Sequence, residues 1–245
     1  ILLGVDDALP KDLLNTFRLV GIIHIVVLSG YNITIVAESI RGLLGFLSRK
    51  KALIFSAGGI ILFSIMVGLT PSVVRALIMA LLALVARATH RRYDVARALA
   101  LAAFAMVLWN PMYLVFDIGF QLSFLATIAL IWISPWFLQR LTRVPEKFGL
   151  REVVSTTVAV QLFVLPFLAY QSGIISLISF VVNVLILPIV PLVMVMGFVT
   201  GTLGLVSSAL AFVPGAITYA TLFYIIWVSE VFSKLPGSVI SITNI

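Results

Sequence analysis

Residues 52–69 read Ala52-Leu-Ile-Phe-Ser-Ala-Gly-Gly-Ile-Ile-Leu-Phe-Ser-Ile-Met-Val-Gly-Leu69 and contain no charged side chain. An α-helix needs about 20 mostly apolar residues to cross the hydrocarbon core of a membrane. This stretch therefore predicts a membrane-spanning helix, and similar stretches occur on both sides of it.

Together these stretches predict an all-α, polytopic transmembrane helix bundle of about nine spans. The seventh and eighth spans are short and are separated by Pro188 and Pro191. They are either two crossings or one re-entrant hairpin that enters the membrane and returns, and both choices leave the end of the chain on the same side. Such an interrupted segment is a possible re-entrant or broken helix pair. The expected spans are residues 19–40, 52–69, 72–88, 96–110, 118–138, 153–170, 174–187, 190–206 and 213–233.

The composition supports a membrane protein. Of the 245 residues, 62% are hydrophobic and only 10% are charged, whereas soluble domains carry about 25% charged residues. The mean hydropathy is +1.23. A soluble fold of this size could not hide so much apolar surface from water, so a soluble enzyme is excluded.

Basic residues gather in alternate loops and predict the orientation. The loops after the second, fourth, sixth and eighth spans lack Lys and Arg. Because basic loops stay in the cytoplasm, the N-terminus is expected outside and Lys234 inside. The basic loops contain Arg41, Arg49, Lys50 and Lys51, then Arg87, Arg91, Arg92 and Arg97, then Arg140, Arg143, Lys147 and Arg151.

The first residues precede the bundle. The chain begins at Ile1 rather than Met, and we interpret residues 1–245 as a single membrane-embedded domain of a longer protein. Leu13, Leu14 and Phe17 share one helical face, so residues 10–17 predict a short helix lying in the membrane interface.

Polar side chains inside spans are costly, and each marks either function or contact between helices. The first expected span holds His24, Ser29 and Asn32, and later spans hold Gln161 and Asn183. Both interpretations stay open for these residues. In the eighth span, Gly-Phe-Val-Thr-Gly at residues 197–201 is a GxxxG pattern, which favours close helix packing.

Arg75 and Asp117 are the charged residues that need the most explanation. Arg75 lies about one turn into the third span, near the expected external face, so it must extend outward or meet a carboxylate. Asp117 opens the fifth span near the same face, with Gln121 one turn deeper. A polar vestibule and a structural Arg75–Asp117 ion pair are both compatible with this placement.

Catalysis is not expected. The chain has no cysteine and two histidines, which excludes disulfides and thiolate metal sites. His24 and Ser29 are five residues apart, about 140° around a helix, so they do not form a nucleophile–base pair. We therefore predict no catalytic residue, no metal ligand and no cofactor, and the chain itself is not expected to be an enzyme.

Three blocks resemble the competence domain of the ComEC family. They are Gly21-Ile-Ile-His24 with Ser29-Gly-Tyr-Asn32, Pro71-Ser-Val-Val-Arg75, and Asp117-Ile-Gly-Phe-Gln-Leu-Ser-Phe124, in family order. The family usually has a second histidine where this chain has Asn32. The resemblance is most specific over the first 125 residues.

The resemblance implies an inner-membrane channel that passes single-stranded DNA into the bacterial cytoplasm during natural transformation. It also implies partners: OB-like and nuclease domains of the same protein, a DNA receptor and an ATP-driven motor. A monomer and a homodimer are both compatible. Cationic and aromatic side chains bind single strands. The expected DNA-path or gating residues are His24, Ser29, Asn32, Arg75, Asp117, Gln121, Phe120 and Phe124.

Two other functions remain compatible with the sequence. A small-solute or ion transporter would have the same hydropathy, and so would a membrane anchor for soluble domains. Flux independent of DNA would favour the transporter, and a core without a water-accessible path would favour the anchor.

Overall fold

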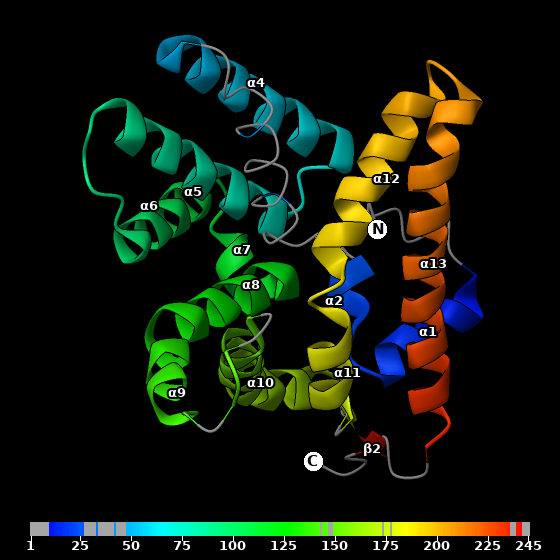
Figure 1. The fold of residues 1–245 in the computed structure, drawn as a ribbon. Helices are drawn as coiled ribbons and strands as arrows, with labels where there is room; N and C mark the ends of the chain where they lie inside the picture. Colours follow the sequence, from blue (N-terminus) through cyan, green and yellow to red (C-terminus); the bar gives the residue numbers. More distant parts are fainter. Residues whose placement is uncertain are drawn as a thin grey trace. The chain divides into compact units, whose positions relative to one another are not determined.

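The computed structural model describes residues 10–26, 33, 42, 48–142, 144–146, 149–172, 174–176, 178–235 and 239–241. The chain divides into two compact units, which are described separately. The first unit comprises residues 1–27 and 132–245, and the second comprises residues 28–131. Figure 1 shows that helices make up nearly all of the described chain.

The second unit begins with the antiparallel helices α4 (Arg49–Val67) and α5 (Pro71–Ala88). Gly68 ends α4 with a φ of +94°, a conformation that glycine adopts without strain. Pro71 then opens α5, where its missing N–H costs no helical hydrogen bond. Ile60 of α4 and Val73 of α5 are among the fully buried side chains that join the two helices.

Three further helices complete the second unit: α6 (Val95–Trp109), α7 (Met112–Phe116) and α8 (Ile118–Ile128). Asp94 caps α6 by accepting the N–H of Arg97 at 3.1 Å. Asn110 ends α6, and its Oδ1 accepts the N–H of Met112 at 3.0 Å, which starts α7. α5 packs against both α6 and α8.

The expected fifth span is one apolar segment over Ile118–Arg140. It contains α8, a π-helical turn η2 (Ala129–Ile133) and α9 (Ser134–Arg140). Pro135 lies in the first turn of α9, where it removes an N–H that would continue the α-helical pattern. The boundary between the two units falls within η2.

In the first unit, α1 (Lys11–Leu19) ends at the residue where the predicted first span begins. A turn at residues 20–22, in which Gly21 has a φ of +75°, separates α1 from α2 (Ile23–Val26). No helix runs through this turn, so the first expected span does not start at residue 19. Most of that span, residues 27–32 and 34–40, lies outside the described residues, and its existence stays a prediction. α1 covers the expected interfacial segment, and its placement at a membrane surface stays a prediction.

The first unit continues with α10 (Leu150–Ser172), which packs against α9 and contains Pro166. A strand β1 (Ile174–Ser176) follows it and pairs with β2 (Val239–Ser241) in an antiparallel ribbon, with Ser176 opposite Val239. Between these strands lie α11 (Ser179–Ile186), α12 (Val190–Gly204) and α13 (Ser208–Ser233).

The α11–α12 pair bends by 47° at the break around Pro188. A re-entrant hairpin has to reverse the chain, whereas a bend of this size keeps its direction. α12 and α13 then pack as an antiparallel pair, and α13 also reaches α11 (Figure 1). The pair is a broken helix, and the start of α11 lies at the same end of this unit as the end of α13.

The predicted GxxxG contact is only partly right. A Cβ built on Gly201 would meet nothing within 4 Å, whereas one on Gly215 of α13 would lie 3.4 Å from Thr200 Cγ2. Thr200 and Thr218 hydroxyls are 3.3 Å apart across the same contact. α12 and α13 do approach closely, but through Thr200 and Gly215 rather than through Gly201.

Among the described residues, five helices are long and apolar enough to cross a membrane, and the bent α11–α12 pair makes six. α6, with 15 residues, is apolar but shorter. Large apolar side chains on these helices are exposed, such as Phe104, Leu108 and Phe223, which is the surface that a lipid solvent requires. The prediction of an all-α membrane bundle is confirmed, whereas the count of nine spans is not.

Candidate functional site

Arg75 is a buried cation in the second turn of α5. Its side chain is 9% exposed, and its guanidinium carbon lies 5.9 Å from the centre of the Phe124 ring. This distance is within the range of a cation–π interaction. Arg75 Nε has no hydrogen-bond partner in the part of the chain that the structure describes. The guanidinium therefore keeps an unused donor inside the second unit.

Phe124 belongs to a row of three aromatic side chains that ends at Arg75, the other two being Tyr113 and Phe120. The Phe120 and Phe124 centroids are 4.3 Å apart, and those of Tyr113 and Phe120 are 6.4 Å apart with nearly parallel planes. Phe120 is only 4% exposed, so it is already packed between two rings. These rings pack one after another up to Arg75. Phe120 therefore has no free face on which a nucleic-acid base could stack.

Asp117 and Gln121 hold the corner between α7 and α8. Asp117 Oδ1 accepts the N–H of Phe120 at 2.6 Å, which caps the start of α8. Gln121 Nε2 donates to the carbonyl oxygens of Leu114 at 2.8 Å and Val115 at 3.0 Å, near the end of α7. Both side chains satisfy helix ends that would otherwise lack partners.

The expected Arg75–Asp117 ion pair does not form. Both side chains are described, and no ion pair joins them. Arg75 also does not extend outward, because it is buried against Phe124. The sequence placed the two charges near one face but could not show that the carboxylate is engaged in a helix cap.

Tyr93 is a site residue that the sequence interpretation missed. It lies in the basic loop after α5, and its hydroxyl donates to the Met79 carbonyl oxygen at 3.3 Å. Partial burial raises the pKa of Tyr93, and the nearby positive charge of Arg75 lowers it to a smaller extent. Tyr93 thus approaches Arg75 from the end of α5 opposite to Pro71. A single aromatic residue between Arg92 and Asp94 was the available signal.

The structure describes little of the remaining expected path residues, His24, Ser29 and Asn32. The backbone of His24 belongs to α2, but its side chain is outside the described set. Ser29 and Asn32 lie outside the described residues altogether. Their proposed roles in shaping or gating a path therefore stay predictions.

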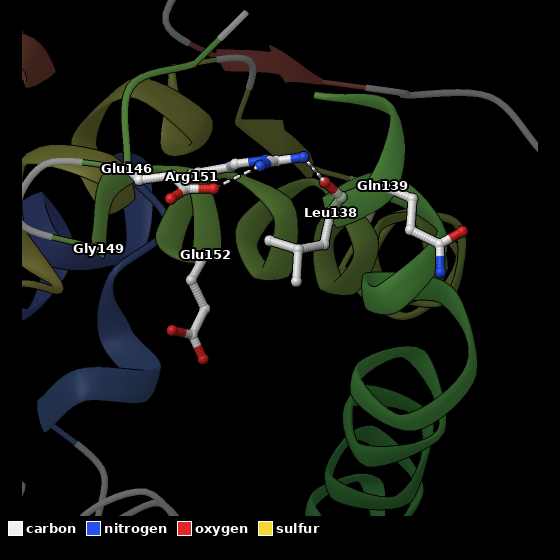
Figure 2. Close-up of a pocket in the computed structure, with 6 residues that line it drawn as sticks. All are labelled: Leu138, Gln139, Glu146, Gly149, Arg151 and Glu152. Atoms are coloured by element: carbon white, nitrogen blue, oxygen red, sulfur yellow. Dashed lines mark hydrogen bonds and ion pairs between the residues drawn. The ribbon is translucent and has the colours of Figure 1, made fainter. Parts of the chain in front are cut away.

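A surface pocket lies in the first unit where α9 ends and α10 begins, and Figure 2 shows its lining. Its volume is about 380 Å³. Arg151 crosses it, donating from Nη1 to Glu146 Oε1 and from Nη2 to the Leu138 carbonyl oxygen, both at 2.7 Å. These contacts tie the loop after α9 to α10. The pocket holds no grouped catalytic side chains: its other lining residues are Gln139, Gly149 and Glu152.

Among the described residues, no three His, Asp or Glu side chains gather closely enough to hold a metal ion. The arrangement that the structure does provide is a buried arginine, supported by aromatic rings, inside a bundle of apolar helices. The chain is thus a polytopic helical membrane protein with a buried cation as its candidate site.

Comparison with known proteins assigns the family. The competence protein family matches residues 1–245. A curated relative, "ComE operon protein 3" of Bacillus subtilis (strain 168), is 30% identical over 200 residues, which cover 81% of this chain and 25% of the relative. The chain therefore belongs to the competence protein family, and it matches about a quarter of that relative's length. No solved structure matches the chain.

Proposed function

We propose that this chain is the membrane channel domain through which single-stranded DNA enters the bacterial cytoplasm during natural transformation. Membership of the competence protein family supports a role in DNA uptake. The observation that carries the finer proposal is Arg75, a buried guanidinium whose Nε has no partner in the described chain.

A phosphate group fits this guanidinium. Arginine presents a planar set of N–H donors that match phosphate oxygens, and an apolar setting strengthens such charged hydrogen bonds. The guanidinium carbon of Arg75 lies over the Phe124 ring, and its Nε donor has no partner among the described residues. Arg75 would bind successive phosphates weakly enough for the strand to move on, while Asp117 and Gln121 hold the α7–α8 corner.

We further propose eight crossings instead of nine. α11 and α12 count as one broken span, and α6 counts as a short span. The first span is kept as the sequence predicts it, although most of it lies outside the described residues. The six residues 173–178 between α10 and α11 can extend by at most about 22 Å, less than the roughly 30 Å of hydrocarbon core. The ends of α10 and α13 and the start of α11 then share one side.

This count changes the expected orientation of Lys234. α10 crosses the membrane once, so residue 172 at its end lies on the side opposite to the basic loop that precedes α10. Lys234, at the end of α13, lies on the same side as residue 172 and therefore opposite to that loop. With basic loops in the cytoplasm, both the N-terminus of this segment and Lys234 lie outside the bacterial inner membrane. A cysteine replacing Leu235 should react with an impermeant maleimide on intact cells, and one replacing Arg92 should react only after permeabilisation. The opposite pattern at residue 235 would restore the count of nine.

In this proposal the chain conducts DNA and does not cleave it. Degradation of one strand would belong to a nuclease domain of the longer protein, next to an OB-like domain. A DNA receptor and an ATP-driven motor would act as separate partners. A second copy of the chain is compatible with the channel but is not required by it.

The test replaces Arg75 in the full-length protein of a transformable host. Arg75→Gln removes the charge and Arg75→Glu reverses it, while Arg92→Gln removes an exposed positive charge as a matched control. We expect internal, nuclease-protected DNA to fall at least about tenfold with Arg75→Gln, a loss of about 1.4 kcal/mol in binding, and further with Arg75→Glu. Surface-bound DNA and the amount of inserted protein should not change.

Normal uptake with Arg75→Glu would remove Arg75 from the path. Equal loss of uptake with Arg92→Gln would show that general positive charge, not the buried site, matters. In the first case a solute transporter or an anchor becomes the better function for the chain.

A further inference from the structure

A strip of polar side chains, called here the α10–α11 strip, lies in the first unit and is separate from Arg75. It comprises Gln161 of α10, Ser176 of β1, and Ser179 and Asn183 of α11. Gln161 Nε2 donates to Ser179 Oγ, which in turn donates to the Ser176 carbonyl oxygen at 2.8 Å. Asn183 follows Ser179 by one turn, on the same face of α11.

Three oxygen or hydroxyl groups of this strip have no hydrogen-bond partner among the described residues. They are Gln161 Oε1, Ser176 Oγ and Asn183 Oδ1. Asn183 is 8% exposed. Several other buried hydroxyls of the helices donate to a carbonyl four residues earlier, as Ser64 does to Ile60 and Ser229 to Ile225. Outside the strip, the buried Ser155 Oγ also lacks a partner among the described residues, but it stands alone and not in a row. The strip therefore differs from the ordinary way in which this chain satisfies polar groups.

The break after α11 adds a further acceptor. Pro188 has no N–H, so the carbonyl oxygen of Val184 cannot receive its usual helical hydrogen bond. The strip thus runs from the start of α11 to its break and is rich in acceptors. Gln161 Oε1 and Asn183 Oδ1 can only accept, so their missing partners must be donors, whereas the Ser176 hydroxyl can both donate and accept. Unsatisfied acceptors are costly in a protein surrounded by lipid.

Water is the donor that fits this strip. One water molecule supplies two donors and needs two to four polar partners, and Gln161 Oε1 and Ser176 Oγ lie on the two residues that Ser179 links. The start of α11 lies at the end of the unit where α13 ends and β1 pairs with β2. A strip that begins there is within reach of the aqueous phase.

We propose that the α10–α11 strip lines a water-filled crevice, which enters the first unit at the start of α11 and reaches Asn183. Non-helical or broken backbone is stable at membrane depth where it lines a hydrated cavity, and the crevice explains how the break at Pro188 is tolerated. The proposal does not depend on DNA or on the role of Arg75.

The test uses the absence of cysteine from this chain. Ser179→Cys and Asn183→Cys are made one at a time in the full-length protein, in native membranes. Ser64→Cys and Ser229→Cys are matched controls, because these serines are 0% exposed, Ser179 is 6% exposed, and each replacement of serine exchanges only oxygen for sulfur. A small charged methanethiosulfonate is the probe, and unreacted thiols are counted by a gel shift after denaturation.

Only the thiolate reacts, and a thiol in dry apolar surroundings stays protonated. We expect the cysteines at positions 179 and 183 to react at least about tenfold faster than those at 64 and 229. Strip cysteines as inert as the controls would overturn the proposal, because the oxygens would then be satisfied inside the protein. Controls as reactive as the strip would also overturn it, because labelling would then report general opening of the helices.

Because Asn183→Cys changes the shape of the side chain, Ser179→Cys alone carries the comparison if the former variant does not accumulate. A further variant, Asn183→Leu, closes the deep end of the crevice without adding a thiol. Combined with Ser179→Cys, it should leave the thiol at position 179 reactive, since that position lies at the mouth. Loss of reactivity there would contradict the proposed direction of entry.

Discussion

Gly21 is the position where one added methyl group should cost the most stability. Its φ of +75° lies in the left-handed region, and a Cβ built there would overlap the Cβ of Ser179. The backbone strain of a non-glycine residue costs about 1–2 kcal/mol, and forcing an extra carbon into a packed contact costs about 1–3 kcal/mol. Gly21→Ala should therefore lower the free energy of unfolding by about 2–5 kcal/mol.

Two other glycines separate these contributions. Gly68 also has a positive φ, +94°, with a ψ of 134°, but nothing lies within 4 Å of its added Cβ, so Gly68→Ala should cost only the backbone strain of about 1–3 kcal/mol. Gly58 lies inside α4 with open space around it, and Gly58→Ala should stabilise the helix by about 0.5–1 kcal/mol.

The assay is unfolding of the purified protein in mild detergent micelles by an increasing fraction of denaturing detergent, followed by circular dichroism. The expected order of stability is Gly58→Ala, then the unchanged protein, then Gly68→Ala, then Gly21→Ala. If Gly21→Ala is no less stable than Gly68→Ala, the α1–α2 turn does not pack on α11 as the structure shows, and the reasoning is refuted.

Three more predictions use the same unfolding assay. A double-mutant cycle with Arg75→Met and Phe124→Leu should give a coupling of about 0.5–2 kcal/mol from the cation–π contact, and zero coupling would remove that contact. Asp117→Ala should cost about 1 kcal/mol by loss of the α8 cap, with Asp117→Asn nearly neutral; a cost of about 3–5 kcal/mol for both would instead indicate the ion pair with Arg75. Glu146 is 80% exposed, so Glu146→Gln should change the free energy of unfolding by at most about 1 kcal/mol. Arg151→Met should cost about 1–3 kcal/mol, because it also leaves the Leu138 carbonyl oxygen without its donor. Equal costs for the two variants would show that the Leu138 contact contributes nothing to stability.

Long uninterrupted apolar stretches could be predicted well from the sequence. The expected spans 52–69, 72–88 and 153–170 correspond to α4, α5 and α10 within a few residues. Their signal is simple because lipid requires one long apolar helix and no particular partner. The hydropathy of residues 118–138 likewise predicted one span, but not its π-helical turn, since that depends on hydrogen bonds around Pro135.

Interrupted segments were predicted less well. The turn at Gly21 was included in the first span, because hydropathy does not register a single change of backbone direction. The pair around Pro188 was predicted to be broken, but its bend of 47° was needed to decide against a hairpin. In the proposed count of eight crossings, this pair crosses once instead of twice, which is why Lys234 is then expected on the other side of the membrane.

The candidate site could be predicted by residue type but not by partner. Arg75 and Asp117 were identified because charges inside spans are costly. Their supposed pairing failed because the nearest cap donor, the N–H of Phe120, is in the same turn as Asp117. Tyr93 was missed because it is distant in sequence from Arg75, and only the return of the chain after α5 brings it close.

The free-energy cost of placing Arg75 inside a span gives a reason to expect that this residue has a function. Placing arginine in the middle of a span costs about 2.5–3.5 kcal/mol on insertion scales, and this is an upper bound for Arg75, which lies in the second turn of α5. The cation–π contact with Phe124 offsets about 0.5–2 kcal/mol of this cost, so the contacts among the described residues do not balance all of it. Arg75→Met should therefore leave the free energy of unfolding unchanged or raise it by up to about 3 kcal/mol, while DNA uptake falls. A clear loss of stability with Arg75→Met would show that the guanidinium holds the bundle together, and Arg75 would then be a structural residue instead of the anion site of the channel.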